Sequence, residues 1–270
     1  EEVVVRFSGD SGDGMQLAGN IFSNVSAGIG DEISTFPDYP AEIRAPQGTL
    51  GGVSGFQVHI GKGVHTPGDL ADVLVAMNPA ALKTNARYVK KGGVVIIDSD
   101  SFRASDLEKA AFTTDDPIQE AGLSHAQIVP VAITQMVKDS LADSGLDNKS
   151  IVRCKNMFAL GLVCWLFDRP LEQAQHLLKN KFAKKPAIYE ANAKVMRDGY
   201  NYGNNIHASV STYRVESAQV KPGIYTDVNG NTATAWGLIA ASEKSGLPLF
   251  LGSYPITPAT DILHELAKRK

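Results

Sequence analysis

Cysteine is scarce in this sequence: only Cys154 and Cys164 occur among 270 residues. Two thiolates cannot complete the four-cysteine site of an iron–sulfur cluster, so we expect no metal site in this chain. Both cysteines lie in an apolar helical run, where a thiol is usually a buried, unreactive small apolar group. The low cysteine content also predicts a reduced, cytoplasmic protein.

The sequence also lacks a long apolar run and a basic cluster. The longest apolar stretches, VVII from Val94 and FALGLVCWLF from Phe158, are much shorter than a membrane span of about 20 residues. The net charge is −3, which argues against nucleic acid or a membrane surface as a partner. No signal peptide is visible, and because Glu1 is not an initiator methionine we expect the natural N-terminus to be missing.

Apolar residues make up 43% of the chain, enough for a substantial core. Short β-branched runs predict six strands, several of which precede a helical pattern. This alternation predicts an α/β fold with a doubly wound, mostly parallel sheet. The predicted strands cover residues 3–8, 31–36, 52–60, 73–76, 93–98 and 128–131.

The rest of the sequence predicts helices and then a second α/β domain. Amphipathic segments at 155–167, 171–182 and 186–202 complete a first domain over residues 1–205, and 206–223 has the character of an extended linker. From residue 224 the pattern predicts helices at 231–245 and 258–270 around a short strand at 247–252. Such a small set cannot bury a core, so we expect the second domain to be incomplete here.

A glycine-rich turn, GDSGDG, follows the first predicted strand at residues 9–14 and opens a helix. Glycines let the backbone approach an anion, and a helix N-terminus offers free N–H groups and a positive dipole, so this turn is a candidate phosphate cradle. Its spacing differs from the dinucleotide fingerprint, and no Walker lysine follows. Asp10 and Asp13 would repel a phosphate unless they face ribose hydroxyls or N–H donors. A tight turn without a ligand remains the alternative.

The segment FPDYPAEIRAPQGTLGG, residues 36–52, is long for a connection between two strands. Long ordered loops are often functional. Glu42 and Arg44 point the same way if the chain is extended, and Arg44 would suit a phosphate or carboxylate. A solvated surface ion pair of little energetic value is the alternative.

Several segments together resemble the fused gamma/alpha subunit of 2-oxoacid:ferredoxin oxidoreductases. They follow one another in the order of that subunit across essentially the whole chain, and YPITP is the most specific. One departure is Thr232, which stands where many relatives have a glutamate. The segments are the glycine-rich start at 9–19, FPDYPAEIR at 36–44, NMFALG at 156–161, GNTATAWG at 230–237 and YPITP at 254–258.

The resemblance implies oxidative decarboxylation of a 2-oxoacid to an acyl-coenzyme A. Thiamine diphosphate is then shared between the alpha domain and a separate beta subunit, whose iron–sulfur cluster passes electrons to ferredoxin. The GNTATA motif most resembles the 2-oxoglutarate branch of the family and favours 2-oxoglutarate as the substrate, while pyruvate and branched-chain oxoacids remain open. By the same resemblance, no turnover is expected from this chain alone.

The resemblance also assigns residues. The gamma domain is expected to hold coenzyme A, whose diphosphate suits the glycine-rich turn, with Arg44 and Asn156 as weaker candidates. In YPITP, Thr257 precedes a helix opened by Pro258 and is a natural N-cap. The resemblance implies that Thr257 instead contacts the substrate carboxylate beside Tyr254, and that the glutamate activating thiamine lies beyond residue 270. The turn residues assigned to coenzyme A are Gly9, Asp10, Ser11, Gly12, Asp13 and Gly14.

Two other classes of protein stay open. One is an NAD-type oxidoreductase domain, which the glycine spacing disfavours. The other is a nucleotide-binding or assembly module without catalysis.

Overall fold

The computed structural model describes residues 2–40, 45–206, 212–218 and 221–269. The chain divides into two compact units, Glu1–Val220 and Lys221–Lys270. The division lies within the predicted linker, and the limits of the two functional domains stay a prediction.

The first unit is built on a six-stranded sheet with the order β2-β3-β1-β4-β5-β6. Parallel pairing joins β1 to β4, β4 to β5 and β5 to β6, whereas β3 is antiparallel to both β1 and β2. The predicted mostly parallel α/β sheet is therefore confirmed, with β3 as the reversed strand. The strands are β1 (Val3–Asp10), β2 (Glu32–Asp38), β3 (Val53–Gly61), β4 (Ala71–Ala76), β5 (Val89–Asp98) and β6 (Gln127–Val131).

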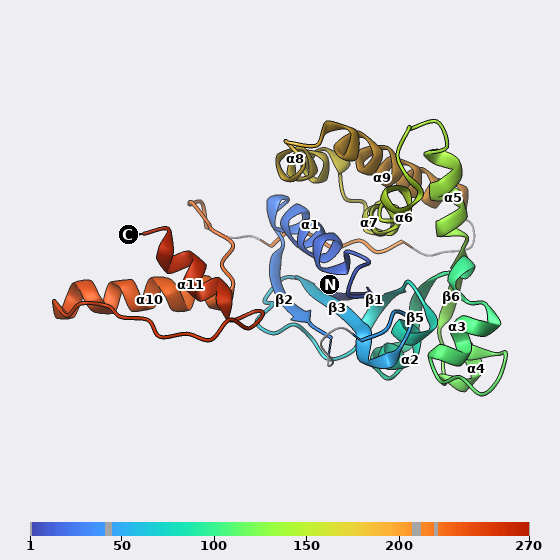
Figure 1. Ribbon diagram of the computed structural model, residues 1–270, viewed down its shortest axis with the longest axis horizontal. Coiled ribbons are helices and arrows are strands. Elements are labelled where there is room, and N and C mark those ends of the chain that lie inside the picture. Colours follow the sequence, from blue (N-terminus) through green and yellow to red (C-terminus); the bar gives the residue numbers. More distant parts are fainter. Residues whose placement is uncertain (1, 41–44, 207–211, 219–220, 270) are drawn as a thin grey trace. The chain divides into compact units, whose positions relative to one another are not determined.

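Helices cover both faces of the sheet (Figure 1). One face packs on α1 (Met15–Gly28), α5 (Ile133–Ser140), α7 (Lys155–Leu166), α8 (Leu171–Lys181) and α9 (Pro186–Ile206) in the larger core cluster. On the other face the smaller core cluster includes α2 (Pro79–Asn85) and α3 (Ala104–Lys109), near α4 (Pro117–Glu120). The short α6 (Asn148–Val152) precedes α7. Successive β1 residues alternate between the faces because side chains of a strand alternate.

Helices α7 and α9 cross closely. The sequence predicted both as amphipathic, but α7 is almost entirely buried, because it packs against α9, α1 and α5. Both cysteines are buried, as predicted. Burial raises the pKa of Cys154 to about 11 and that of Cys164 to about 12, which keeps both thiols protonated and unreactive.

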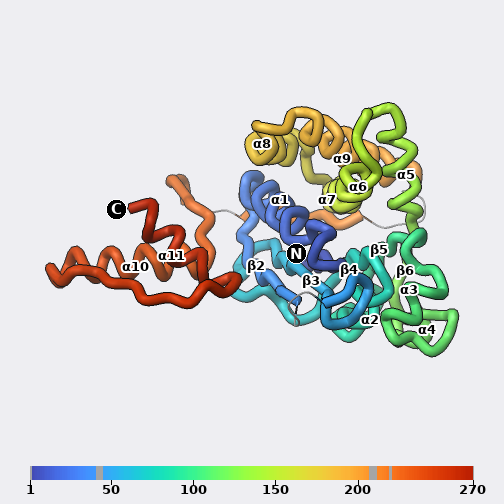
Figure 2. Tube along the Cα trace, viewed as in Figure 1, coloured from blue at the N-terminus to red at the C-terminus, as the bar shows by residue number. Residues whose placement is uncertain are grey.

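Residues 212–218, in the predicted linker, pack against the first unit. The Tyr213 ring stacks on Phe167 with centroids 5.0 Å apart, and its amide donates to the Leu166 carbonyl. The Ala218 amide donates to the Gly30 carbonyl. The backbone trace in Figure 2 follows this extended course.

The second unit contains α10 (Gly230–Ser245) and α11 (Thr260–Ala267). The predicted strand at 247–252 is wrong, because these residues form no regular structure and a lone strand has no neighbour to pair with. The second helix begins at Thr260, not at Pro258. Ala235 is the one fully buried apolar residue among those described in this unit, whereas Ile224, Phe250 and Tyr254 are largely exposed.

Candidate functional site

The glycine-rich turn joins β1 to α1 as predicted. β1 ends at Asp10 and α1 begins at Met15, after Gly14, whose φ of 74° is in the left-handed region that favours glycine. A Cβ at Gly12, by contrast, would meet only the Gln47 side chain, at 3.8 Å. Gly12 is thus the place where the loop backbone is open to another molecule.

The two loop carboxylates face N–H donors. Asp13 accepts from the Asp10 amide at 3.0 Å, and both Asp10 carboxylate oxygens accept from the Gly48 amide at 3.1 Å. Burial raises the pKa of Asp10, an effect that the Gly48 amide, Asn78 and Lys155 oppose and that Asp13 reinforces. The predicted requirement that these carboxylates meet N–H groups is therefore satisfied inside the protein.

Internal bonds use part of the loop's donor capacity. The Asp10 amide donates to Asp13, the Ser11 amide to the Gly52 carbonyl at 3.2 Å, and the Asp13 amide to the Asp10 carbonyl at 2.8 Å. An anion at this turn would therefore depend on Gly12, on the first amides of α1, which have no partner inside their own helix, and on side chains nearby.

Two such side chains come from the start of α7. The Lys155 ammonium lies 3.4 Å from the Asp13 carboxylate, and both side chains are mostly buried. The Asn156 amide donates to the Gly14 carbonyl at 3.1 Å, while its buried Oδ1 has no partner among the described residues. The fold thus brings Asn156 to the predicted turn from 142 residues away in the sequence.

A cavity of about 290 Å³ opens beside the turn. Its wall comes from the carboxyl ends of β1, β4 and β5, where ligands bind in open α/β sheets. Asn78 caps α2 by accepting from the Ala81 amide at 2.8 Å. The other charged and polar lining residues include Asp10, Gln47, Asp100, Arg103, Asp106, Lys109, Thr134 and Lys155.

Among the predicted site residues that the structure describes, Asp10 lines this cavity and the others do not. Arg44 and Glu42 lie outside the described residues. Tyr254 and Thr257 belong to the second unit, where both are exposed. The prediction that Thr257 caps a helix is wrong: Ala259 is the N-cap of α11, because residues 257–259 form a turn ahead of the helix.

The sequence analysis missed Lys155 and Asn78 as members of the site. Lys155 directly precedes Asn156 in the NMFALG region, and Asn78 follows the end of a predicted strand. The carboxyl ends of parallel strands meet at one sheet edge, so the position of Asn78 could have identified it. Nothing in the local sequence around Lys155 pairs it with Asp13.

A sheet with helices on both faces, and polar residues gathered beyond the ends of its central strands, defines an open, doubly wound α/β domain. Residues 4–202 match the model of the pyruvate ferredoxin/flavodoxin oxidoreductase family, and the chain belongs to that family.

Relatives agree with this assignment. The chain is 48% identical, over its whole length, to the 2-oxoglutarate oxidoreductase subunit KorA of Mycobacterium tuberculosis, and spans 41% of that protein. Over 74% of its length it is 26% identical to the common gamma subunit of the pyruvate/ketoisovalerate oxidoreductases of Thermococcus kodakarensis, 96% of which is covered.

Two solved structures share the fold. The 2-oxoglutarate:ferredoxin oxidoreductase from Magnetococcus marinus matches the whole chain with a TM-score of 0.74 and 24% identity, over 41% of its own chain. The gamma subunit of a keto/oxoacid ferredoxin oxidoreductase from Geobacter sulfurreducens matches 75% of the chain with a TM-score of 0.53 and 22% identity, over 99% of its own chain.

Proposed function

We propose that this chain contributes the coenzyme A site and part of the substrate site to a 2-oxoacid:ferredoxin oxidoreductase that acts on 2-oxoglutarate. The observation that carries the proposal is the 48% identity to KorA over the whole chain, which includes the glycine-rich turn and YPITP. Pyruvate and branched-chain oxoacids are the competing substrates, since the Thermococcus relative is named for pyruvate and ketoisovalerate.

The turn offers a partial fit for the diphosphate of coenzyme A. Gly12 is open, the first turn of α1 supplies free amides, and Lys155 brings a cation close to Asp13. The buried Asn156 Oδ1 supplies an acceptor for a ligand N–H or hydroxyl. We assign the diphosphate to Gly12, Gly14 and Lys155, with Gly9, Asp10, Ser11 and Asp13 shaping the turn. The Magnetococcus marinus protein, which has this fold, was solved with coenzyme A bound.

For the second unit we propose that Thr257 binds the substrate carboxylate and that Tyr254 lines the same pocket. In the assembled enzyme thiamine diphosphate supplies the decarboxylating chemistry. Because Thr257 does not cap α11, its hydroxyl is available to donate to a carboxylate. The Thr257 hydroxyl would then hold the substrate by donating a hydrogen bond. It would take no part in the bonds that form or break, and its role would be to orient the substrate.

The proposed partners follow from the same family. A beta subunit carrying the iron–sulfur cluster and sharing thiamine diphosphate would complete the active site, with ferredoxin as electron acceptor, in the cytoplasm. The Thermococcus relative is named as one subunit among others. No described helix is both long and apolar enough to cross a membrane.

The test is coenzyme-A-dependent reduction of a viologen dye by the assembled natural complex, with 2-oxoglutarate, pyruvate and 2-oxoisovalerate compared. A clear preference in kcat/KM for 2-oxoglutarate is expected. Thr257→Ala should lower kcat/KM by roughly ten- to a hundredfold, since a hydrogen bond to a charged group is worth about 1.5–3 kcal/mol, while Thr257→Ser should retain most activity. Equal activity of Thr257→Ala and wild type would remove Thr257 from the site, and a preference for pyruvate would overturn the substrate.

A further inference from the structure

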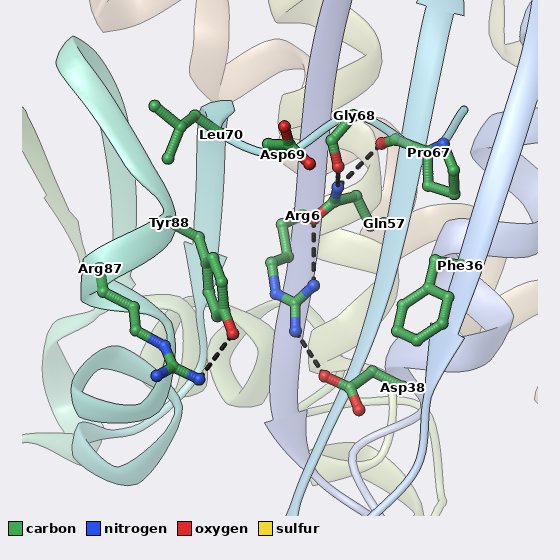
Figure 3. Close-up of a pocket in the computed structure, with 10 residues that line it drawn as sticks. All are labelled: Arg6, Phe36, Asp38, Gln57, Pro67, Gly68, Asp69, Leu70, Arg87 and Tyr88. Atoms are coloured by element: carbon green, nitrogen blue, oxygen red, sulfur yellow. Dashed lines mark hydrogen bonds and ion pairs between the residues drawn. The ribbon is translucent and has the colours of Figure 1, made fainter. Parts of the chain in front are cut away.

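A second, larger cavity of about 650 Å³ lies on the face of the sheet opposite α1. Its volume is within the usual range of small-molecule sites. The residues around it come from β1, β2, β3, the loop before β4 and the turn at 86–88 (Figure 3). They are Arg6, Phe36, Asp38, Gln57, Pro67, Gly68, Asp69, Leu70, Arg87 and Tyr88, none of which borders the cavity at the glycine-rich turn.

Arg6 forms the floor of this cavity, and its side chain is only 8% exposed. Three acceptors hold its guanidinium: Asn85 at 2.5 Å, Gln57 at 3.0 Å and Asp38 at 2.5 Å. A guanidinium carries five N–H groups, so these bonds to described residues leave two donors for another acceptor. Asp38 compensates the buried charge of Arg6, so what Arg6 offers to a ligand in the cavity is these two remaining N–H groups.

A second arginine adds to the positive charge. The Tyr88 ring stands between Arg6 and Arg87 (Figure 3), and the two guanidinium carbons are 5.2 and 4.7 Å from its centroid. Arg87 donates to the Tyr88 hydroxyl at 2.6 Å, and no carboxylate among the described residues pairs with it. Two guanidinium groups therefore flank one ring, with Asp38 as the single carboxylate paired to either of them in the described structure.

The rest of the wall selects the kind of anion. Phe36 and Leu70 are 50% and 44% exposed, and with Pro67 and Tyr88 they present apolar surface to the cavity. Asp38 and Asp69 on the lining would repel a phosphate dianion more than a carboxylate of single charge. The planar guanidinium also matches the two oxygens of a carboxylate.

We propose that this cavity binds a small organic carboxylate with an apolar or aromatic body. The carboxylate accepts from the remaining N–H groups of Arg6, Arg87 adds positive charge across the Tyr88 ring, and the body rests on Phe36 and Leu70. This site belongs to the first unit alone, and its assignment is independent of the function proposed for the glycine-rich turn.

The probe is phenylacetate, titrated into the ¹⁵N-labelled 270-residue chain and followed by NMR. Saturable shifts are expected at the amides of Phe36, Leu70 and Tyr88. The exposed Arg87 allows the variant Arg87→Gln without disturbing the buried Arg6, and it should weaken binding at least tenfold. Lys91→Gln removes the same charge at an exposed position outside the cavity and should change affinity less than twofold.

Other outcomes would overturn the assignment. These are the absence of saturable shifts, equal affinity of Arg87→Gln and wild type, or shifts confined to residues 9–14. Two further probes test the chemistry: 2-phenylethanol, which lacks the carboxylate, should not bind, and inorganic phosphate should bind at least tenfold more weakly. Equal binding of either probe would contradict a carboxylate site. Phe36→Ala should weaken phenylacetate binding severalfold, and no effect would overturn the placement of the apolar body.

Discussion

Gly12 is the residue of the glycine-rich turn at which a side chain disturbs the fold least. Its Cβ would have only the Gln47 side chain within 4 Å, whereas a Cβ at Gly9 would lie 2.9 Å from the Asp13 carboxylate and one at Gly14 would collide with Asn156. Gly12→Val therefore separates ligand binding from folding, which the other two glycines cannot do.

We expect Gly12→Val to bind coenzyme A at least tenfold more weakly in the assembled complex, because the side chain occupies the space in which a diphosphate would approach the backbone. Gly12→Ala should have a smaller effect. Isothermal titration calorimetry measures both, and thermal unfolding of the variants should stay close to that of wild type. Unchanged affinity in a folded Gly12→Val protein would show that coenzyme A does not use this turn.

Asp31 and Arg169 form a buried ion pair in the first unit, with a 2.6 Å contact between Nη2 and Oδ2. Burial raises the pKa of Asp31 to about 6 despite the opposing Arg169 charge. The folded state therefore holds the Asp31 proton up to a higher pH than the unfolded chain does. The resulting stabilisation is complete below pH 4 and is lost as the pH rises through about 6.

Asp31→Asn removes this titration. The wild type should therefore gain about 1–3 kcal/mol of unfolding free energy relative to the variant as the pH falls from 7 to 4. At pH 7 the variant should already be less stable, because Arg169 loses its buried partner. Urea unfolding across this pH range measures the difference. A difference independent of pH would contradict the raised pKa.

The crossing of α7 and α9 depends on glycine. A Cβ at Gly161 would lie 1.9 Å from the Met196 carbonyl oxygen, and one at Gly199 would lie 2.1 Å from that of Phe158. Because these neighbours are backbone atoms, they cannot turn aside as a flexible side chain could. The two helices are close enough only because neither position carries a side chain.

Gly161→Ala or Gly199→Ala should therefore destabilise the first unit by about 3 kcal/mol or more, beyond the usual cost of overpacking, although alanine favours helix formation more than glycine does. Urea unfolding followed by circular dichroism measures this loss. The matched control is Asn201→Ala on the exposed side of α9, which should change stability by less than about 0.5 kcal/mol. A similarly small effect at both glycines would contradict the close crossing.

All six strands of the first unit could be predicted because short apolar runs rich in β-branched residues mark each one. The reversed direction of β3 could not, since alternation along a strand does not record which neighbour it pairs with. In the second unit, the local sequence of Thr257 and Pro258 predicts a helix start, but both lie in the turn at 257–259 that precedes α11. The meeting of Asn156 with Gly14 required a resemblance to a family, because contacts across 142 residues leave no local pattern.

The two units of the molecule differ in how far they bury their apolar residues. The first has two core clusters around its sheet. In the second, α11 buries none of its described residues, and Leu247, Phe250 and Ile256 are exposed. Exposed apolar residues in this number indicate an interaction surface. The chain spans only 41% of the length of KorA. Tyr254 and Thr257 lie on this uncovered unit.

We therefore expect the purified 270-residue chain to show no 2-oxoglutarate-dependent reduction of viologen, even with coenzyme A and thiamine diphosphate added. A catalytic site must hold its groups rigidly in the productive geometry, and a unit without a core cannot do so. Limited proteolysis supplies the physical control: cleavage should fall within residues 221–269 and leave the first unit intact, because exposed, poorly packed segments open most readily. Measurable turnover by the isolated chain would show that the second unit is competent without further covering.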